Sequence, residues 1–201
     1  MRAEDAKKAM LDESVKLIAE QGLAGLSFRE MARRSGLSHQ APYHHFANRA
    51  GILAAIALEG FSRLDLKLRE AEGLSPPGAP RDGLRQTLKA YMSFAIENPV
   101  YFRIMFRPEL VDMARYPDVR DLAMSTFDRL VKAVTACRPR LSAAKRTDIS
   151  NVLWAAAHGV ATLWLDGPIA AKSPTTSIDT LIDLGSLMFA EAGATTRLAE
   201  T

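Results

Sequence analysis

The sequence consists largely of stretches with the 3.6-residue apolar period of α-helices, and none alternates every two residues as a half-buried strand does. The cleanest stripe begins after Pro117 and ends before Pro139. The segment GLSPPGAP at 73–80 cannot continue a helix, because proline lacks a backbone N–H and glycine favours turns. We therefore predict an all-α fold of about nine helices, with 73–80 as a linker-like segment.

Three predicted helices, separated by glycines, occupy the N-terminal region. The first covers residues 4–21 and ends at Gly22. The second begins after Ser27, whose hydroxyl is placed to cap it, and Gly36 interrupts it. Ser38 is placed to cap a short third helix that ends near residue 45. Two short helices joined by a glycine-containing turn, after a longer helix, are the parts of a helix-turn-helix.

The third segment, SHQAPYHHF at 38–46, has the composition of an exposed helix. It holds a hydroxyl, an amide, three imidazoles and a phenol, whereas Phe46 is expected in the core. Such polar groups hydrogen-bond base edges in the major groove and neighbouring phosphates, and the small Ala41 allows close approach. Residues 1–50 also carry 8 Lys and Arg against 6 Asp and Glu, which is most of the +3 net charge of the chain. These features predict a DNA-reading helix.

The stretch LSFREMARRSGLSHQAPYHHFANRAGIL resembles the N-terminal signature of the tetracycline-repressor (TetR) family of transcriptional regulators. The resemblance implies that Tyr43 contacts phosphate and that Arg49, at the start of the fourth helix, holds the DNA backbone. Gln40 stands where the family often has glycine, and glutamine can read adenine through two hydrogen bonds. The predicted DNA-binding residues are Ser27, Arg29, Ser38, His39, Gln40, Ala41, Tyr43, His44, His45 and Arg49.

We predict two domains, a helix-turn-helix DNA-binding domain at 1–48 and an effector-binding and dimerisation domain at 49–201. The predicted helix at 142–165 is apolar nearly all round, so it must be buried on two sides. One side fits the core of its own subunit. The other side and the apolar last helix each need a partner, which predicts a four-helix bundle across the two-fold axis of a homodimer. The predicted interface residues are Ile149, Val152, Ala156, Val160, Leu163, Ile178, Leu181, Ile182, Gly185, Met188 and Phe189.

The motif Trp154-x-x-x-His158-Gly159 and the upstream NPVYFRIMF resemble the TetR subgroup whose sensing domain is named for its Trp-His-Gly motif. The resemblance implies a cavity for a small, mainly apolar effector, with His158 as the polar group that orients it. The predicted pocket residues are Tyr91, Phe94, Phe102, Met105, Phe106, Phe127, Trp154 and His158. A plain core remains the alternative, in which His158 only hydrogen-bonds a carbonyl.

Other functions find little support in the sequence. His39, His44 and His45 lack the i, i+4 spacing of a helical zinc pair, so we expect no metal and no cofactor. We expect no enzyme, because there is no nucleophile elbow or phosphate loop, and Cys137 stands alone. A helical adaptor that has lost DNA binding is the third alternative, which the polar third helix disfavours.

The sequence also predicts a cytoplasmic protein. Its N-terminus mixes acids and bases without an apolar stretch, and the longest apolar run, 152–165, falls short of the roughly 18 residues of a membrane span. One cysteine cannot form an internal disulfide, which agrees with a reducing compartment. The expected function is a ligand-released repressor that binds a palindromic operator as a dimer.

Overall fold

The computed structural model describes residues 2–195, and over these residues it is helical, without strands. This confirms the predicted all-α fold. The ten α-helices of the described chain are α1 (Ala3–Gln21), α2 (Phe28–Arg34), α3 (Ala41–His45), α4 (Arg49–Gly73), α5 (Pro80–Glu97), α6 (Pro99–Met105), α7 (Pro117–Cys137), α8 (Ala143–Leu165), α9 (Pro168–Lys172) and α10 (Ile178–Thr195). A 3₁₀ turn, η1 (Leu23–Gly25), follows α1.

The chain packs as two compact units. The first contains the residues up to Ser62 together with Asn98–Leu122, and the second contains Arg63–Glu97 and the residues from Ala123 onward. Both α4 and α7 continue from one unit into the other. The predicted domain boundary after residue 48 therefore lies inside the first compact unit. That this boundary separates DNA binding from effector binding and dimerisation stays a prediction.

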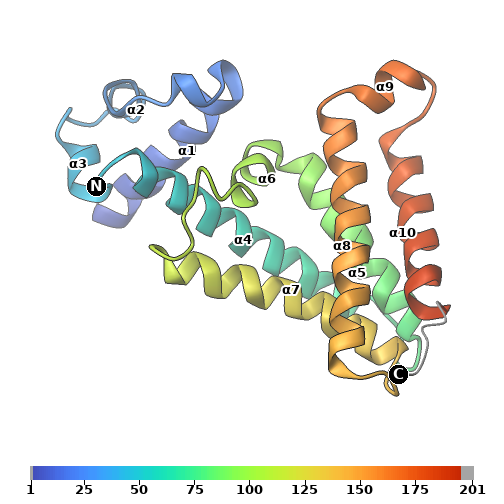
Figure 1. Ribbon diagram of the computed structural model, residues 1–201. Coiled ribbons are helices and arrows are strands. Elements are labelled where there is room, and N and C mark those ends of the chain that lie inside the picture. Colours follow the sequence, from blue (N-terminus) through green and yellow to red (C-terminus); the bar gives the residue numbers. More distant parts are fainter. Residues whose placement is uncertain (1, 196–201) are drawn as a thin grey trace. The chain divides into compact units, whose positions relative to one another are not determined.

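In the first unit, α2 packs on the amphipathic α1, whose Met10 and Leu17 are fully buried (Figure 1). The Ser14 hydroxyl donates to the Met10 carbonyl at 2.8 Å and also lies 2.9 Å from the Met31 sulfur of α2. Ser27 caps α2 as predicted, since its Oγ accepts from the backbone N–H of Glu30 at 3.5 Å. These contacts give the short helices a fixed core to rest on.

The start of α3 differs from the prediction. Its N-cap is Gln40, and the Ser38 carbonyl instead accepts from the Ala41 N–H at 3.0 Å in a turn. Pro42 explains the difference. A helix capped by Ser38 would need a hydrogen bond from the nitrogen of residue 42, which proline lacks, whereas in the first turn of a helix that begins at 41 no such bond is needed.

α4 begins where the sequence predicts, because the Asn48 side chain accepts from the Gly51 N–H at 3.0 Å. Farther along, α6 lies close against α4: a Cβ on Gly60 would be 2.6 Å from the Met105 sulfur. A larger residue at 60 would therefore push these two helices apart. Near this crossing the rings of Phe61, Phe102 and Phe106 form T-shaped contacts with centroids 5.5–5.7 Å apart.

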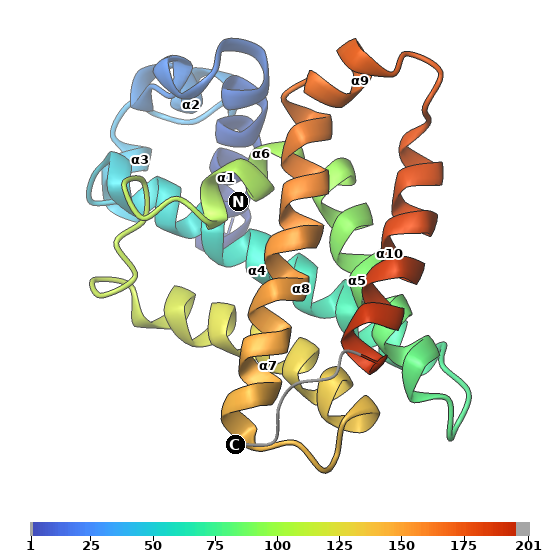
Figure 2. The same cartoon turned by 45° about the vertical axis from the view of Figure 1, so that its right-hand side comes forward.

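In the second unit, α5, α8 and α10 pack on one another (Figures 1 and 2). Ser142 caps α8 as predicted, since its Oγ accepts from the Lys145 N–H at 3.3 Å. At Gly193 of α10 a Cβ would lie 2.8 Å from a Leu153 methyl carbon, so glycine allows close contact with α8. The short α9 was not predicted from the sequence; it begins at Pro168, after Gly167 in a left-handed conformation.

Candidate DNA-binding surface and sensing site

Tyr43 on α3 is held by its ring and remains accessible. Its ring packs against Phe28 of α2 with centroids 4.8 Å apart, yet the residue is 62% exposed. The neighbouring Pro42 and Phe46 are buried and attach α3 to the core, which confirms the expectation for Phe46. A side chain fixed at the ring and exposed elsewhere is suited to contact an external phosphate.

The other predicted DNA-binding residues are mostly on the surface of the first unit. Half-buried positions are Ala41 and His45. Exposed positions are Ser27, Arg29, Ser38, His39, Gln40, His44 and Arg49. The structure thus brings a hydroxyl, an amide and imidazoles to accessible positions in and just before α3, as base and phosphate recognition requires.

Arg49 has a further contact that the sequence did not predict. Its guanidinium donates a hydrogen bond to the Leu23 carbonyl in η1. The start of α4 is thereby tied to the turn after α1. This arginine therefore has a structural partner within its own chain.

Glu30 organises the arginines of α2. Arg33 donates to it at 2.6 and 2.9 Å, Arg34 donates at 2.9 Å, and Arg34 also pairs with Glu20 of α1 at 2.8 Å. Hydrogen bonds from Arg33 and then Arg34 lower the pKa of the Glu30 carboxyl to about 2. This leaves Arg29 as the one arginine of α2 without an ion pair among residues 2–195.

The second unit brings together three of the predicted pocket residues through hydrogen bonds. The Trp154 indole N–H donates to the Tyr91 hydroxyl at 2.9 Å, and the same hydroxyl lies 2.8 Å from Nδ1 of His158. Trp154 also meets Phe127 of α7 edge-on, with centroids 6.0 Å apart. Trp154, His158 and Phe127 are half-buried, so this group remains partly accessible.

Burial favours the neutral form of both titratable members of this group. It raises the pKa of the Tyr91 phenol far above its usual range, an effect only partly offset by the hydrogen bond from Trp154. Burial also lowers the pKa of the His158 imidazole. The Tyr91 oxygen accepts from Trp154, and in its hydrogen bond with Nδ1 of His158 the tautomer of the neutral imidazole decides which group donates.

Thr162 is a residue that the sequence analysis missed. It lies one turn after His158 on α8, and among residues 2–195 its buried Oγ1 has no hydrogen-bond partner. Other helical threonines, such as Thr135 and Thr147, donate to the carbonyl four residues earlier. A polar residue four positions after the histidine, in the otherwise apolar second half of α8, is the signal that could have found it.

The predicted pocket residues are divided between the units. Phe94 is buried in the second unit, whereas Phe102, Met105 and Phe106 belong to the first. There Phe102 and Met105 are buried, and Phe106 is half-buried between Phe61 and Phe102. These three contribute to the core of the first unit.

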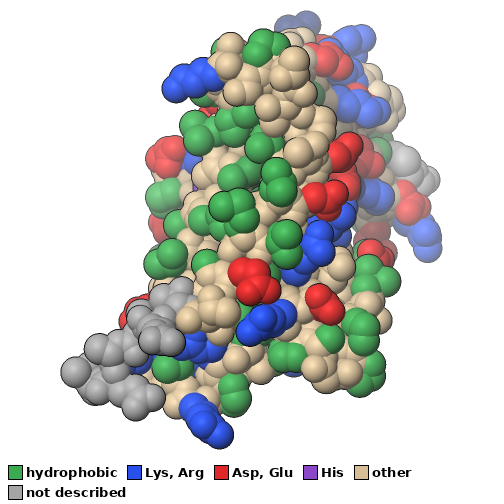
Figure 3. Space-filling model, turned by 90° about the vertical axis from the view of Figure 1, so that its right-hand side faces the viewer, with side chains coloured by type: hydrophobic (Ala, Val, Ile, Leu, Met, Phe, Trp, Pro, Cys, Tyr) green, Lys and Arg blue, Asp and Glu red, His purple; other side chains and the backbone are tan. Residues whose placement is uncertain are grey.

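An apolar surface covers the faces of α8 and α10 that are turned away from their own core (Figure 3). Its exposed large side chains are Val152, Leu163, Leu184, Leu187 and Met188. The half-buried members of the predicted dimer interface are Ala156, Val160, Ile178, Leu181, Gly185 and Phe189. Ile149 and Ile182 are only 8% and 5% exposed, so they belong to the core of their own unit. Leu184 and Leu187 were not predicted.

No group of three or more His, Cys, Asp or Glu side chains within residues 2–195 could hold a metal ion. Over the same residues, none of the helices combines the length and the apolar character needed to cross a membrane.

Two family models match the chain. The model described as bacterial regulatory proteins, tetR family, matches residues 10–56, and the model described as the tetracyclin repressor-like C-terminal domain matches residues 84–185. The second match alone covers half of the chain. A helix-turn-helix followed by a helical C-terminal domain defines a class of bacterial transcriptional regulators. Within that class, this chain belongs to the TetR family.

Solved structures agree in fold. A protein of unknown function from Rhodococcus sp. RHA1 is 26% identical with a TM-score of 0.77, over 94% of this chain and 96% of that one. The TetR family regulator PfmR from Thermus thermophilus is 18% identical with a TM-score of 0.68, over 92% and 96% of the two chains. The fatty acid degradation regulator FadR from Bacillus halodurans is 15% identical with a TM-score of 0.70, over 92% and 94%. Comparison with curated protein sequences gave no match.

Proposed function

We propose that this protein is a ligand-released repressor that binds a palindromic operator as a homodimer. The observation that carries the proposal is the accessible polar surface of α3, which is attached to a buried core by Pro42 and Phe46. Two such surfaces about one DNA turn apart, roughly 34–36 Å, would contact successive major grooves. Tyr43 and Arg29 contact phosphates, and His39, Gln40 and His44 contact bases or nearby phosphates.

A second copy of the chain is the partner that we propose for the apolar surface of α8 and α10. Large apolar side chains exposed together on one face usually mark an interface. A two-fold axis through this surface would bury Val152, Leu163 and Leu187 of both copies and present two recognition helices. Ile149 and Ile182 are left out of the proposed interface, and Leu184 and Leu187 are added to it.

The dimer is tested with two variants. Leu187→Glu places a charge on the apolar surface of α8 and α10. Gly159→Leu adds a side chain on the same face of α8 as Val152, at a position where a Cβ would meet nothing within 4 Å in its own chain. Both should give folded monomers in light scattering after size exclusion. Leu66→Glu, at an α4 position that is 58% exposed, is the matched control and should stay dimeric. Monomeric wild-type protein would contradict the proposal.

For the sensing site we propose a small, mainly apolar effector that contacts Trp154, His158 and Thr162. The support is the half-buried aromatic group beside a buried hydroxyl, since a few polar groups in apolar surroundings are typical of ligand sites. Effector binding releases DNA only if the ligand binds the non-DNA conformation more tightly. The role of FadR in fatty acid degradation makes fatty acids and their esters sensible first probes.

A gel shift with DNA that flanks the gene of this protein tests the regulator, first alone and then against such lipophilic compounds. Wild-type protein should shift the DNA in a salt-dependent manner, because phosphate contacts release counterions. His158→Ala should bind the DNA equally well and respond less to the active compound. An unchanged response would remove His158 from sensing, and the absence of any shift would contradict the proposed function.

A further inference from the structure

A cavity of about 490 Å³ lies in the second unit, beside the linker-like segment at 73–80. This volume is in the range of small-molecule sites, which is roughly 300–1,000 Å³. Its walls come from the end of α4, the linker, the start of α5 and the second half of α7. None of the predicted sensing residues lines it.

Three hydrogen-bond donors on the cavity wall have capacity to bind a ligand. Arg129 is only 16% exposed and uses Nε for Asp65 at 2.6 Å and Nη1 for Glu72 at 3.0 Å, so Nη2 makes no hydrogen bond within the described chain. Lys132 lies one turn further on α7, with Nζ 3.8 Å from Glu72, which is longer than a hydrogen bond. The buried Oγ of Ser75 has no partner among residues 2–195.

Charge selects among possible ligands. The cavity wall contains Arg129, Lys132 and Glu72. Behind the wall, Asp65 pairs with Arg129 at 2.6 Å and with Arg69 at 2.8 Å, so the connected group of three cations and two anions has a single positive charge. A monoanion balances it, whereas a cation or a dianionic phosphate monoester does not. Much of the remaining wall is apolar: Pro76, Ala79, Pro80, Ala133 and Ala136. The ligand therefore combines one negative charge with an apolar body.

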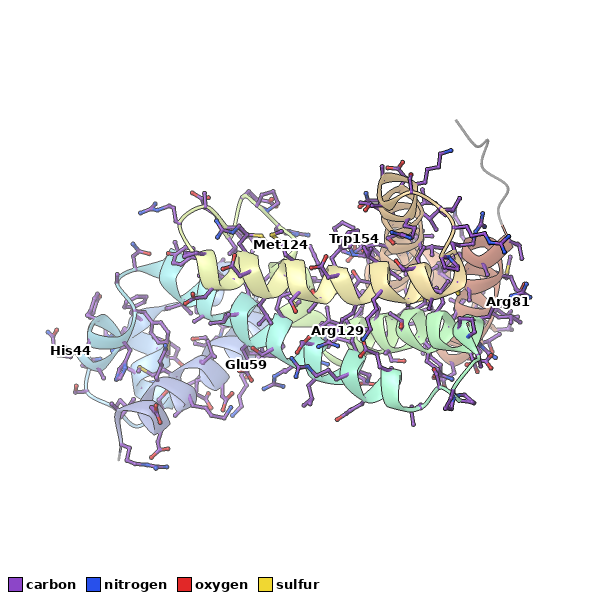
Figure 4. The ribbon with its side chains drawn as sticks, turned by 90° about the horizontal axis from the view of Figure 1, so that it is seen from below. His44, Glu59, Arg81, Met124, Arg129 and Trp154 are labelled. Carbon is purple, nitrogen blue, oxygen red and sulfur yellow. The ribbon has the colours of Figure 1, made fainter. Side chains whose placement is uncertain are left out.

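We propose that this cavity binds a small organic monocarboxylate, at a site distinct from the group around Trp154 and His158. One carboxylate oxygen accepts from Nη2 of Arg129, which remains fixed by its two acidic partners. Figure 4 labels Arg129 beside α7. Lys132 adds a second cation to the recognition of the carboxylate, and the Ser75 hydroxyl donates to it after rotation about the Cα–Cβ bond of the serine. The apolar body lies against the prolines and alanines of the wall.

Benzoate and its neutral analogue benzamide are the probes, titrated into the full-length protein and followed by ligand-detected NMR. Benzoate should bind saturably with a dissociation constant below about 10 mM, and benzamide should bind about tenfold more weakly because it lacks the charge. Lys132→Glu should weaken benzoate binding about tenfold, whereas the charge-matched control Lys172→Glu, on exposed α9, should leave it unchanged.

Ser75→Ala separates recognition from folding. Since the hydroxyl has no partner in the described chain, its removal should not lower the melting temperature, yet it should weaken benzoate binding roughly fivefold. His158→Ala should leave benzoate binding unchanged, which distinguishes this site from the proposed sensing site. Equal binding of benzoate and benzamide, or unchanged binding by both Lys132→Glu and Ser75→Ala, would overturn the proposal, whatever the outcome of the DNA-binding experiments.

Discussion

The α3 surface and the group around Trp154 use similar side chains in opposite environments. On α3, Tyr43 and His44 are exposed, so their polar groups are accessible to an external partner. In the second unit, Tyr91 is buried and hydrogen-bonded to His158, so the polar groups of these two side chains bond to each other. The exposed side chains of α3 have their hydrogen-bonding groups available to a partner molecule. Burial, in contrast, restricts the protonation state and the orientation of the Tyr91 and His158 side chains.

The largest expected effect separates the buried and exposed rings of the helix-turn-helix. Phe46→Ala empties a position that is 3% exposed and should destabilise the protein by about 3–5 kcal/mol. Tyr43→Ala removes only a surface contact with Phe28 and should cost about 1 kcal/mol. Urea unfolding at one fixed protein concentration measures both. Equal losses in the free energy of unfolding would mean that the Tyr43 ring belongs to the core, which would contradict the contrast between these two rings.

Next in size is the loss of the Tyr91 hydroxyl. Tyr91→Phe removes the group that accepts from Trp154 and bonds with His158, in a buried setting, and should cost about 1–3 kcal/mol. The control is Tyr116→Phe, at a half-buried tyrosine of the first unit, which should change stability by less than about 0.5 kcal/mol. Thermal unfolding of the two variants compares them directly, and a cost for Tyr91→Phe no larger than for the control would show that the hydrogen bonds contribute nothing.

Helix caps should have smaller effects of similar size in both units. Ser27→Ala and Ser142→Ala each remove a side-chain acceptor at a helix start, and each should cost about 0.5–1 kcal/mol. Denaturant midpoints at constant slope give the values. If only one variant loses stability, the backbone N–H groups at the helix start of the other variant have found a different hydrogen-bond acceptor.

The smallest effect is the pH dependence due to His158. Burial lowers the pKa of its imidazole below the ordinary 6.5, so near that pH the unfolded chain binds more protons than the folded one. Stability should therefore fall as the pH drops through about 6.5. His158→Gln should lose this component in melting curves from about pH 8 to about pH 5. Identical pH profiles for the variant and the wild type would show that His158 is not the source.

Much of the fold could be predicted from the sequence because its signals are local. Apolar period and stop residues predicted most helices, and the caps at Asn48 and Ser142 were placed correctly. The start of α3 was misplaced because the missing N–H of Pro42 outweighs the capping preference of Ser38. The short α9 has too few residues to show a period.

The site was harder to predict because its parts are distant in sequence. Tyr91 and His158 are 67 residues apart, so no local pattern indicates their hydrogen bond. Helical angles alone placed Ile149 on the outer face, but the width of the buried face of α8 depends on where its neighbours α5 and α10 pack. Exposed residues of α3 were easier to identify, since polar groups crowded into a short helix have few uses inside a core.

The most direct test of the account is operator binding by Tyr43→Ala, measured at one salt concentration beside wild type and Tyr43→Phe. Tyr43→Ala should remain a folded dimer and bind DNA at least about tenfold more weakly, because it loses one phosphate contact and holds α3 less firmly. Tyr43→Phe keeps the ring and should bind with intermediate affinity. Wild-type affinity for Tyr43→Ala would contradict the claim that the exposed face of α3 reads DNA through this residue.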